Sequence, residues 1–243
     1  MKIDIEKWLR DYTDAVKREF QNRVWFIGLQ GSYGRGEATE NSDIDVVLIL
    51  DTVSFDDLTV YSGLLDKLSN RDKVCGFVSG KREIESWDKA DLFQFCHDAV
   101  PVYGSLDELL QTVGEEDIKR AIHTGACNLY HACVHNAVHE KSGEMLGEFY
   151  KAAAFLLQAI AYLQRGVFER KQENLPAILM PEERAIWEAR WKLKKESQVS
   201  EVRFAELSEL LIDWTAKWIV EDQREANGER KLIFEKESRE GLQ

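Results

Sequence analysis

The sequence predicts an α/β domain followed by an all-α helical bundle. Up to about residue 110, short apolar runs of strand length alternate with helical stretches. Beyond that point, apolar residues recur only at helical spacing. A chain of 243 residues is long enough for two such cores. We therefore expect one domain over residues 1–110 and a second over residues 111–243.

The first domain is expected to open with an amphipathic helix over residues 3–20, where apolar residues lie on one helical face. The run Ile44–Leu50 is apolar throughout, which is typical of a strand buried on both faces. The other expected elements, in order, are a strand at 23–29, a turn and short helix at 31–39, a helix at 55–68, a strand at 73–79, a short helix, and a strand at 100–103.

The second domain is expected to consist of helices joined by short loops. The three prolines of the chain, Pro101, Pro176 and Pro181, fall at expected element boundaries. We expect the charged tail from Asn227 onward to fray. The expected helices are 106–113, 115–140, 143–165, 182–195 and 201–222.

Composition and charge narrow the classes of partner. The net charge of −12 argues against binding to a long nucleic acid, which usually needs a basic face. No N-terminal signal and no apolar run long enough for a membrane span are present, so we expect no membrane partner. The four cysteines lack zinc-site spacing, which favours reduced thiols and a cytoplasmic location.

Two short motifs carry the chemistry. Gly31 and Ser32 follow an apolar strand, and such a turn can offer backbone N–H groups and a hydroxyl to phosphate oxygens. Asp43 and Asp45 open the next strand, where residues two apart point to the same side and can share a divalent metal. Arg35 lies close enough in sequence to reach a phosphate oxygen. Together these residues could hold a nucleoside triphosphate with Mg²⁺.

This pattern resembles the nucleotidyltransferase superfamily of the DNA polymerase β type. The match consists of Gly31-Ser32 and Asp43-Ile44-Asp45, the Gly-Ser and Asp-x-Asp elements of that superfamily. The resemblance implies an α+β nucleotidyltransferase fold with a small mixed sheet, in which the turn binds triphosphate and the two acids bind metal. The layout is similar to that of bacterial antibiotic nucleotidyltransferases, such as the kanamycin and lincosamide enzymes, which carry a helical substrate-binding domain.

The resemblance implies a Mg²⁺-dependent enzyme, with one or two ions, that uses an NTP as donor. We expect it to move AMP from ATP to a hydroxyl of a small molecule, with an antibiotic as one candidate acceptor. The bundle would then bind the acceptor or form a homodimer. Two alternatives stay open: a minimal nucleotidyltransferase that modifies a protein partner, as an antitoxin does, and a nucleotide-binding module without turnover.

One departure from the superfamily concerns its third carboxylate, which usually lies on the next central strand. The expected strand at 73–79 contains no acid. Asp72 precedes this strand, and Glu83 and Glu85 follow Gly80. Because the third acid often acts as the general base, the identity of the base is the open question.

A histidine stripe on the expected helix at 115–140 offers one answer. The stripe is formed by residues that recur every four positions, namely His123, Cys127, His131, His135 and His139. It could be a polar seam of the bundle, or a zinc site, because His pairs at this spacing chelate metals. Alternatively, His131 or His135 could be the catalytic base in an acceptor cleft, since an imidazole titrates near neutrality.

Overall fold

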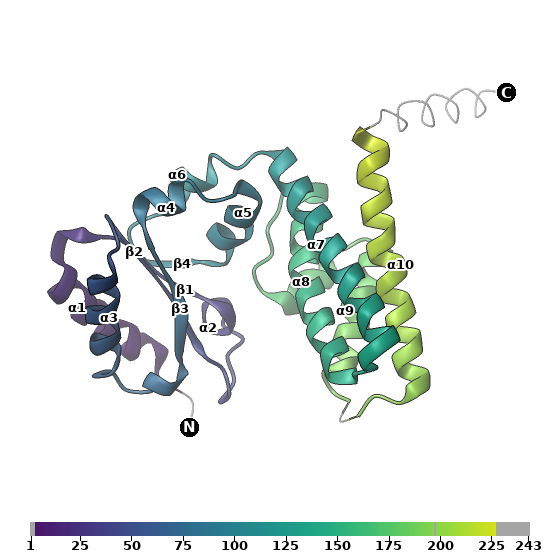
Figure 1. The fold of residues 1–243 in the computed structure, drawn as a ribbon, viewed down its shortest axis with the longest axis horizontal. Coiled ribbons are helices and arrows are strands. Elements are labelled where there is room, and N and C mark those ends of the chain that lie inside the picture. Colours follow the sequence, from purple (N-terminus) through teal and green to yellow (C-terminus); the bar gives the residue numbers. More distant parts are fainter. Residues whose placement is uncertain (1–2, 197, 227–243) are drawn as a thin grey trace. The chain divides into compact units, whose positions relative to one another are not determined.

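The computed structural model describes residues 3–196 and 198–226 (Figure 1). These residues form two compact units, which divide between Gly114 and Glu115. The first unit contains a small mixed sheet with helices, and the second consists of helices. The predicted fold class, an α/β part followed by an all-α part, is therefore confirmed. The predicted fraying from Asn227 onward lies outside the described residues.

The sheet of the first unit has the strand order β3-β2-β1-β4. Its central strands, β1 (Val24–Gln30) and β2 (Ile44–Leu50), are antiparallel. β4 (Val100–Tyr103) is antiparallel to β1, whereas β3 (Val74–Gly80) is parallel to β2. The parallel pair is joined through a helix, as parallel strands require a crossover connection. β3 and β4 therefore form the two edges.

Helices cover both faces of this sheet. One face packs against α1 (Ile5–Phe20) and α3 (Phe55–Leu65). The other packs against α4 (Lys81–Glu85), α5 (Lys89–Asp98) and α6 (Asp107–Leu110). β2 contributes to both cores, because its successive side chains alternate between the faces. Ile44, Val46, Leu48 and Leu50 face α1 and α3, while Val47 and Ile49 face the other side.

Local sequence signals explain where the two helices of the first face begin. Asp4 caps α1 by accepting a hydrogen bond from the Lys7 N–H, and Ser54 and Asp57 form a capping box at the start of α3. The Tyr12 and Tyr61 hydroxyls, 2.8 Å apart, join α1 to α3 inside the core. Burial raises the pKa of Tyr61 to about 12, so this contact stays uncharged at neutral pH.

Arg23 joins the start of β1 to the segment that follows β2. It lies in the short 3-10 helix η1 (Gln21–Arg23) and donates to carboxylates of Asp51 and Asp57, at 3.0 and 2.6 Å. These hydrogen bonds hold the pKa of the Asp57 carboxyl well below its usual range. The contact fixes the end of the β1–β2 pair that lies away from Asp45.

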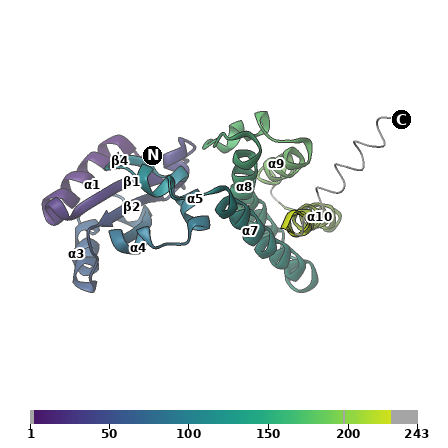
Figure 2. The same ribbon diagram turned by 90° about the horizontal axis from the view of Figure 1, so that it is seen from above.

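The second unit is built from α7 (Glu115–His135), α8 (Gly143–Arg165), α9 (Pro181–Leu193) and α10 (Glu201–Ala226) (Figure 1, Figure 2). α7 packs against α8 and α10, and α9 packs against α8. The buried hydroxyl of Tyr150 on α8 donates to the Leu207 carbonyl of α10 at 2.9 Å. Shorter elements complete the path: the π-helical turn η3 (Asn136–Glu140) and the 3-10 helix η4 (Gln172–Ala177) in this unit, and η2 (Arg71–Lys73) in the first.

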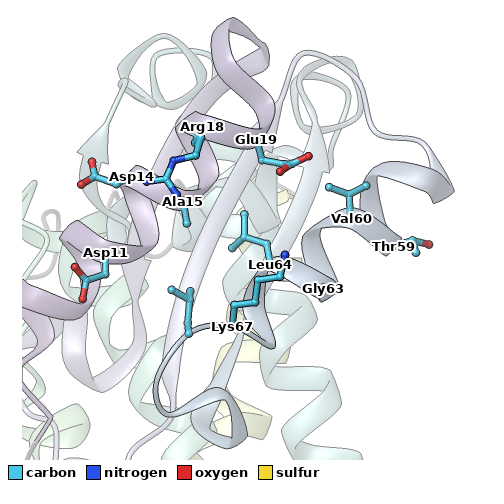
Figure 3. Close-up of a pocket in the computed structure, with 11 residues that line it drawn as sticks. Asp11, Asp14, Ala15, Arg18, Glu19, Thr59, Val60, Gly63, Leu64 and Lys67 are labelled. Atoms are coloured by element: carbon cyan, nitrogen blue, oxygen red, sulfur yellow. The ribbon is translucent and has the colours of Figure 1, made fainter.

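A groove with a volume of about 600 Å³ runs between α1 and α3 (Figure 3). It lies on the face of the sheet that α1 and α3 cover. Its rim carries charges of both signs, from Asp11, Asp14, Arg18, Glu19 and Lys67. None of the predicted site residues lines this groove.

Across residues 3–196 and 198–226, none of the helices has the length and apolar character needed to span a membrane.

Two glycines give a matched test of this sheet. Gly76 on β3 has a φ of +145°, and a Cβ there would lie 1.9 Å from the Val46 carbonyl oxygen of β2. We expect Gly76→Ala to lower the free energy of unfolding by about 3 kcal/mol, because it adds backbone strain to a clash with a central strand. Gly63→Ala on α3 meets no atom within 4 Å. Gly63→Ala should instead raise the free energy of unfolding by about 0.5–1 kcal/mol, since alanine has a higher helix propensity than glycine. Urea unfolding of both variants measures the difference, and equal values would contradict the close β2–β3 contact.

Candidate active site

The register between β1 and β2 brings the two predicted motifs together. Gln30, the last residue of β1, pairs with Asp45 on β2. The Gly31-Ser32 turn follows Gln30 directly, and Asp43 lies just before β2. The turn and the acid pair therefore meet at one end of the two central strands. This meeting point is the candidate site.

Gly31 fits closely against Asp45. Its φ is +64°, and a Cβ on this residue would lie 2.0 Å from Asp45 Oδ2. The site therefore excludes every side chain at position 31, for both conformational and steric reasons.

The short helix α2 (Gly31–Arg35) begins at Gly31 itself, without an intervening turn. The first N–H groups of any helix lack partners within the helix, and here they belong to Gly31, Ser32 and Tyr33. The half-buried Ser32 adds its hydroxyl at the same place. Tyr33 packs into the same core cluster as the buried residues of α1, and this packing anchors α2 to the sheet.

Asp43 is exposed and Asp45 is half-buried. The alternation of β2 points Asp45 to the same face as Val47, the face that α5 covers. The loop before Asp43 is held in place by two contacts. The Thr39 N–H donates to Ser42 Oγ at 2.9 Å, and the Lys73 ammonium donates to the Glu40 carbonyl.

The acid pair suits Mg²⁺, which prefers hard oxygen ligands. Asp45 Oδ2 lies directly beside the turn, in the space that a Cβ at Gly31 would fill. Within residues 3–196 and 198–226, no group of three or more His, Cys, Asp or Glu side chains is arranged to hold a metal ion. A magnesium ion held by Asp43 and Asp45 would therefore complete its coordination with phosphate oxygens and water, as Mg²⁺ commonly does.

Cys75 lies beside Asp45 on the strand where the superfamily usually carries its third carboxylate. β3 runs over Val74–Gly80 and contains no acid, in agreement with the expected strand. Its register pairs Cys75 with Asp45 in a parallel ladder, so both side chains point to the same face. Cys75 is exposed and forms no disulfide. Glu83 and Glu85 lie beyond Gly80, at the opposite end of the strand.

Asp98 is a site residue that sequence reasoning missed. It is the last residue of α5 and is buried, with 9% of its surface exposed. Its Oδ2 accepts a hydrogen bond from the Gly31 N–H and its Oδ1 accepts one from Arg35 Nη1, both at 3.1 Å. Arg35 Nε also donates to Glu37, at 3.1 Å. Two donors of Arg35, which was expected to reach phosphate, are thus committed within the protein. The sequence signal for Asp98 was an acid at the C-terminal end of an expected helix, where acids are disfavoured.

The histidine stripe lies on α7 and the π-helical turn after it, in the second unit. His123 is half-buried, and its Nε2 lies 3.6 Å from the Cys127 Sγ. His131, His135 and His139 are exposed, so they do not form a buried polar seam. The ring centroids of His135 and His139 are 4.7 Å apart, and those of His131 and His135 are 6.4 Å apart. The role of His131 or His135 as a base stays a prediction.

A family model described as a nucleotidyltransferase domain matches residues 9–97. Two curated proteins of Methanocaldococcus jannaschii, each named "Putative protein adenylyltransferase", are similar to part of this chain. The first is 43% identical over 51 residues, which are 21% of this chain and 50% of the relative. The second is 34% identical over 73 residues, which are 30% of this chain and 68% of the relative. The chain thus spans half the length of the first relative and about two thirds of the second.

The fold is similar to that of a spectinomycin adenyltransferase from Enterococcus faecialis, solved with ATP and spectinomycin. The TM-score is 0.50 at 14% sequence identity, and the match covers 85% of this chain and 98% of the other. At this identity the likeness concerns the fold. It extends beyond the sheet, because 85% of the chain includes much of the helical unit.

Gly31 and Gly36 allow a matched test of the site. Both have positive φ, +64° and +74°, but a Cβ at Gly36 meets no atom within 4 Å. Gly31→Ala and Gly36→Ala should therefore cost similar backbone strain, about 1 kcal/mol each. Only Gly31→Ala has to displace the Asp45 carboxylate, so we expect it alone to weaken binding of Mg²⁺–ATP, by about 100-fold. Calorimetric titration with thermal unfolding of each variant checks this. Equal affinity in the two variants would contradict the proposed contact between turn and acid.

Proposed function

The chain belongs to the nucleotidyltransferase family, and from this premise we propose that it transfers AMP from ATP to a hydroxyl of a small molecule, releasing pyrophosphate. The observation that carries the proposal is the fit of Asp45 Oδ2 against Gly31. It supports a site in which the Gly31-Ser32 turn would bind phosphate and Asp43 and Asp45 would bind metal. The matches to adenylyltransferases favour ATP over other donors.

In this proposal, Gly31 lets the triphosphate approach the backbone closely, and Ser32 binds it through its backbone N–H and its hydroxyl. Asp43 and Asp45 would hold one or two Mg²⁺ ions, which would neutralise negative charge on the phosphates and on the leaving pyrophosphate. The acceptor oxygen forms a bond to the α-phosphorus, and the bond from that phosphorus to the bridging oxygen of the leaving pyrophosphate breaks. The residues of the first unit thus bind and orient the donor.

The proton of the acceptor hydroxyl must pass to a base. The strand next to Asp45 presents Cys75 where a carboxylate would serve, so the first unit lacks an acid at that position. His135 and His131 stay candidates for the base, since both imidazoles are exposed on α7. The same helical unit is proposed to bind the acceptor or to form a homodimer.

An antibiotic is the favoured class of acceptor, because the structural neighbour was solved with ATP and spectinomycin. A protein acceptor is the second candidate, favoured by the names of the two curated relatives. A cytoplasmic location fits both, since ATP is available there and the four cysteines form no disulfides.

The decisive experiment measures Mg²⁺-dependent pyrophosphate release from ATP with a panel of aminoglycosides, spectinomycin and lincosamides. We expect release with at least one member, and a fall of about 100-fold or more in Asp43→Asn and Asp45→Asn, which remove metal ligands. Asp56→Asn is the control. Asp56 is exposed on α3, and α3 packs against the face of the sheet that does not carry Asp45.

Transfer of labelled AMP to a protein in place of any antibiotic would favour the second acceptor class. Binding of Mg²⁺–ATP without pyrophosphate release in the presence of any acceptor would support a nucleotide-binding module without turnover. Unchanged metal-dependent binding in both aspartate variants would contradict the site itself.

Cys75 provides a separate test of the metal position. An aspartate there would add a third carboxylate on the face that carries Asp45. We expect Cys75→Asp to lower the Mg²⁺ concentration for half-maximal ATP binding by about 10-fold, because divalent affinity rises with the number of charged oxygen ligands. Cys75→Ser, which removes the thiol without adding charge, should leave this value unchanged. The same Mg²⁺ requirement in both variants would show that position 75 does not face the metal.

A further inference from the structure

Gly31 lies between two carboxylates. Asp45 Oδ2 occupies the space beside its Cα, and Asp98 Oδ2 accepts its N–H at 3.1 Å. These acids come from different elements, β2 and the end of α5. The turn that would receive the most highly charged part of ATP is thus built against negative charge on both sides.

Asp98 stands where a carboxylate is costly. The C-terminal end of a helix carries partial negative charge, which disfavours an acid there, and burial adds a desolvation cost. Two groups of α2 offset these unfavourable terms by donating hydrogen bonds to Asp98: the Gly31 N–H and the Arg35 guanidinium. The side chains of Asp98 and Arg35 are 13% and 11% exposed, so water screens their attraction only in part.

A second bond ties α5 to the same junction. The Gln30 amide donates to the Phe95 carbonyl at 3.1 Å, one residue before the turn. The last turn of α5 therefore holds the chain on both sides of the point where β1 becomes α2. Tyr33 anchors the opposite side of α2 in the core beside α1. The position of the turn is consequently set from both faces of the sheet.

We propose that Asp98 is a positioning residue that fixes the Gly31-Ser32 turn for the triphosphate, and that Arg35 serves the site chiefly by neutralising Asp98. This inference rests on the proposed function. Arg35 acts on the nucleotide through Asp98, without a direct phosphate contact. Without Arg35, the triphosphate would approach a turn backed by the Asp98 carboxylate with no guanidinium to neutralise it.

The pair can be tested by a double-mutant cycle on Mg²⁺–ATP affinity. We expect Arg35→Met to weaken binding by about 30-fold, because it leaves the Asp98 charge buried behind the turn. Asp98→Asn keeps the shape with poorer hydrogen bonds and should weaken binding by about 5-fold. The double variant, with neither charge, should stay near 5-fold, well short of the roughly 150-fold expected if the effects multiplied.

A multiplicative double variant would show that Arg35 contacts the phosphates itself and would overturn the proposal, as would unchanged affinity in both single variants. If Arg35→Met does not fold, the affinity of the double variant is compared with that of Asp98→Asn alone, and the proposal expects the two to be equal. The losses should be equal for Mg²⁺–tripolyphosphate, which shares only the phosphates with ATP. A loss confined to ATP would also overturn the proposal.

Asp91→Asn, an exposed position in the first turn of α5, is the matched control and should bind as the wild type does. Thermal unfolding without ligand separates a loss of fold from a loss of positioning. Failure of the wild type itself to bind Mg²⁺–ATP would overturn the proposed function. Wild-type binding with insensitive variants would overturn only the role of Asp98 and Arg35.

Discussion

The antiparallel pairing of β1 with β2 is the constraint on which the rest of the candidate site depends. It sets Gln30 opposite Asp45, and so brings the turn at Gly31 against the acid pair. A shift by one residue would turn the Asp45 side chain to the α1 face and bury it among apolar groups. The apolar side chains of β2, which enter both cores, make that shift prohibitively costly. Packing far from the site therefore determines the geometry within it.

The two faces of the sheet contribute differently to this geometry. The face under α1 and α3 is a closed apolar core, to which α2 adds Tyr33. The face under α5 carries the polar groups: Asp45 emerges there, and Asp98 and Gln30 make their bonds there. The apolar core on the α1 and α3 face thus holds the charged groups on the α5 face in place. Such pre-organisation matters for phosphoryl transfer, in which the protein acts mainly by positioning and electrostatics.

Much of this could be predicted from the sequence, because the signals were local. The uninterrupted apolar run of β2 and the helix Gly143–Arg165 were predicted with the bounds that the structure has. The Gly-Ser and Asp-x-Asp motifs likewise indicated their own proximity. Asp98 could not be found in this way, since its bond to Gly31 joins residues 67 positions apart. The pairing of Cys75 with Asp45 depends on strand register, which apolar periodicity alone does not specify for an edge strand. The π-helical turn that carries His139 also had no sequence signal.

The left-handed backbone of Gly76 has a consequence for the solubility of the folded chain. β3 is an edge strand, and a flat edge presents backbone groups that can pair with a strand of another molecule and begin aggregation. At Gly76 the φ of +145° departs from the regular extended conformation, so the outer edge is locally irregular midway along a strand whose pairing with β2 is continuous. Gly76, which lets β3 approach β2 closely, thereby also makes the outer edge of β3 less suited to pairing with a strand of another molecule.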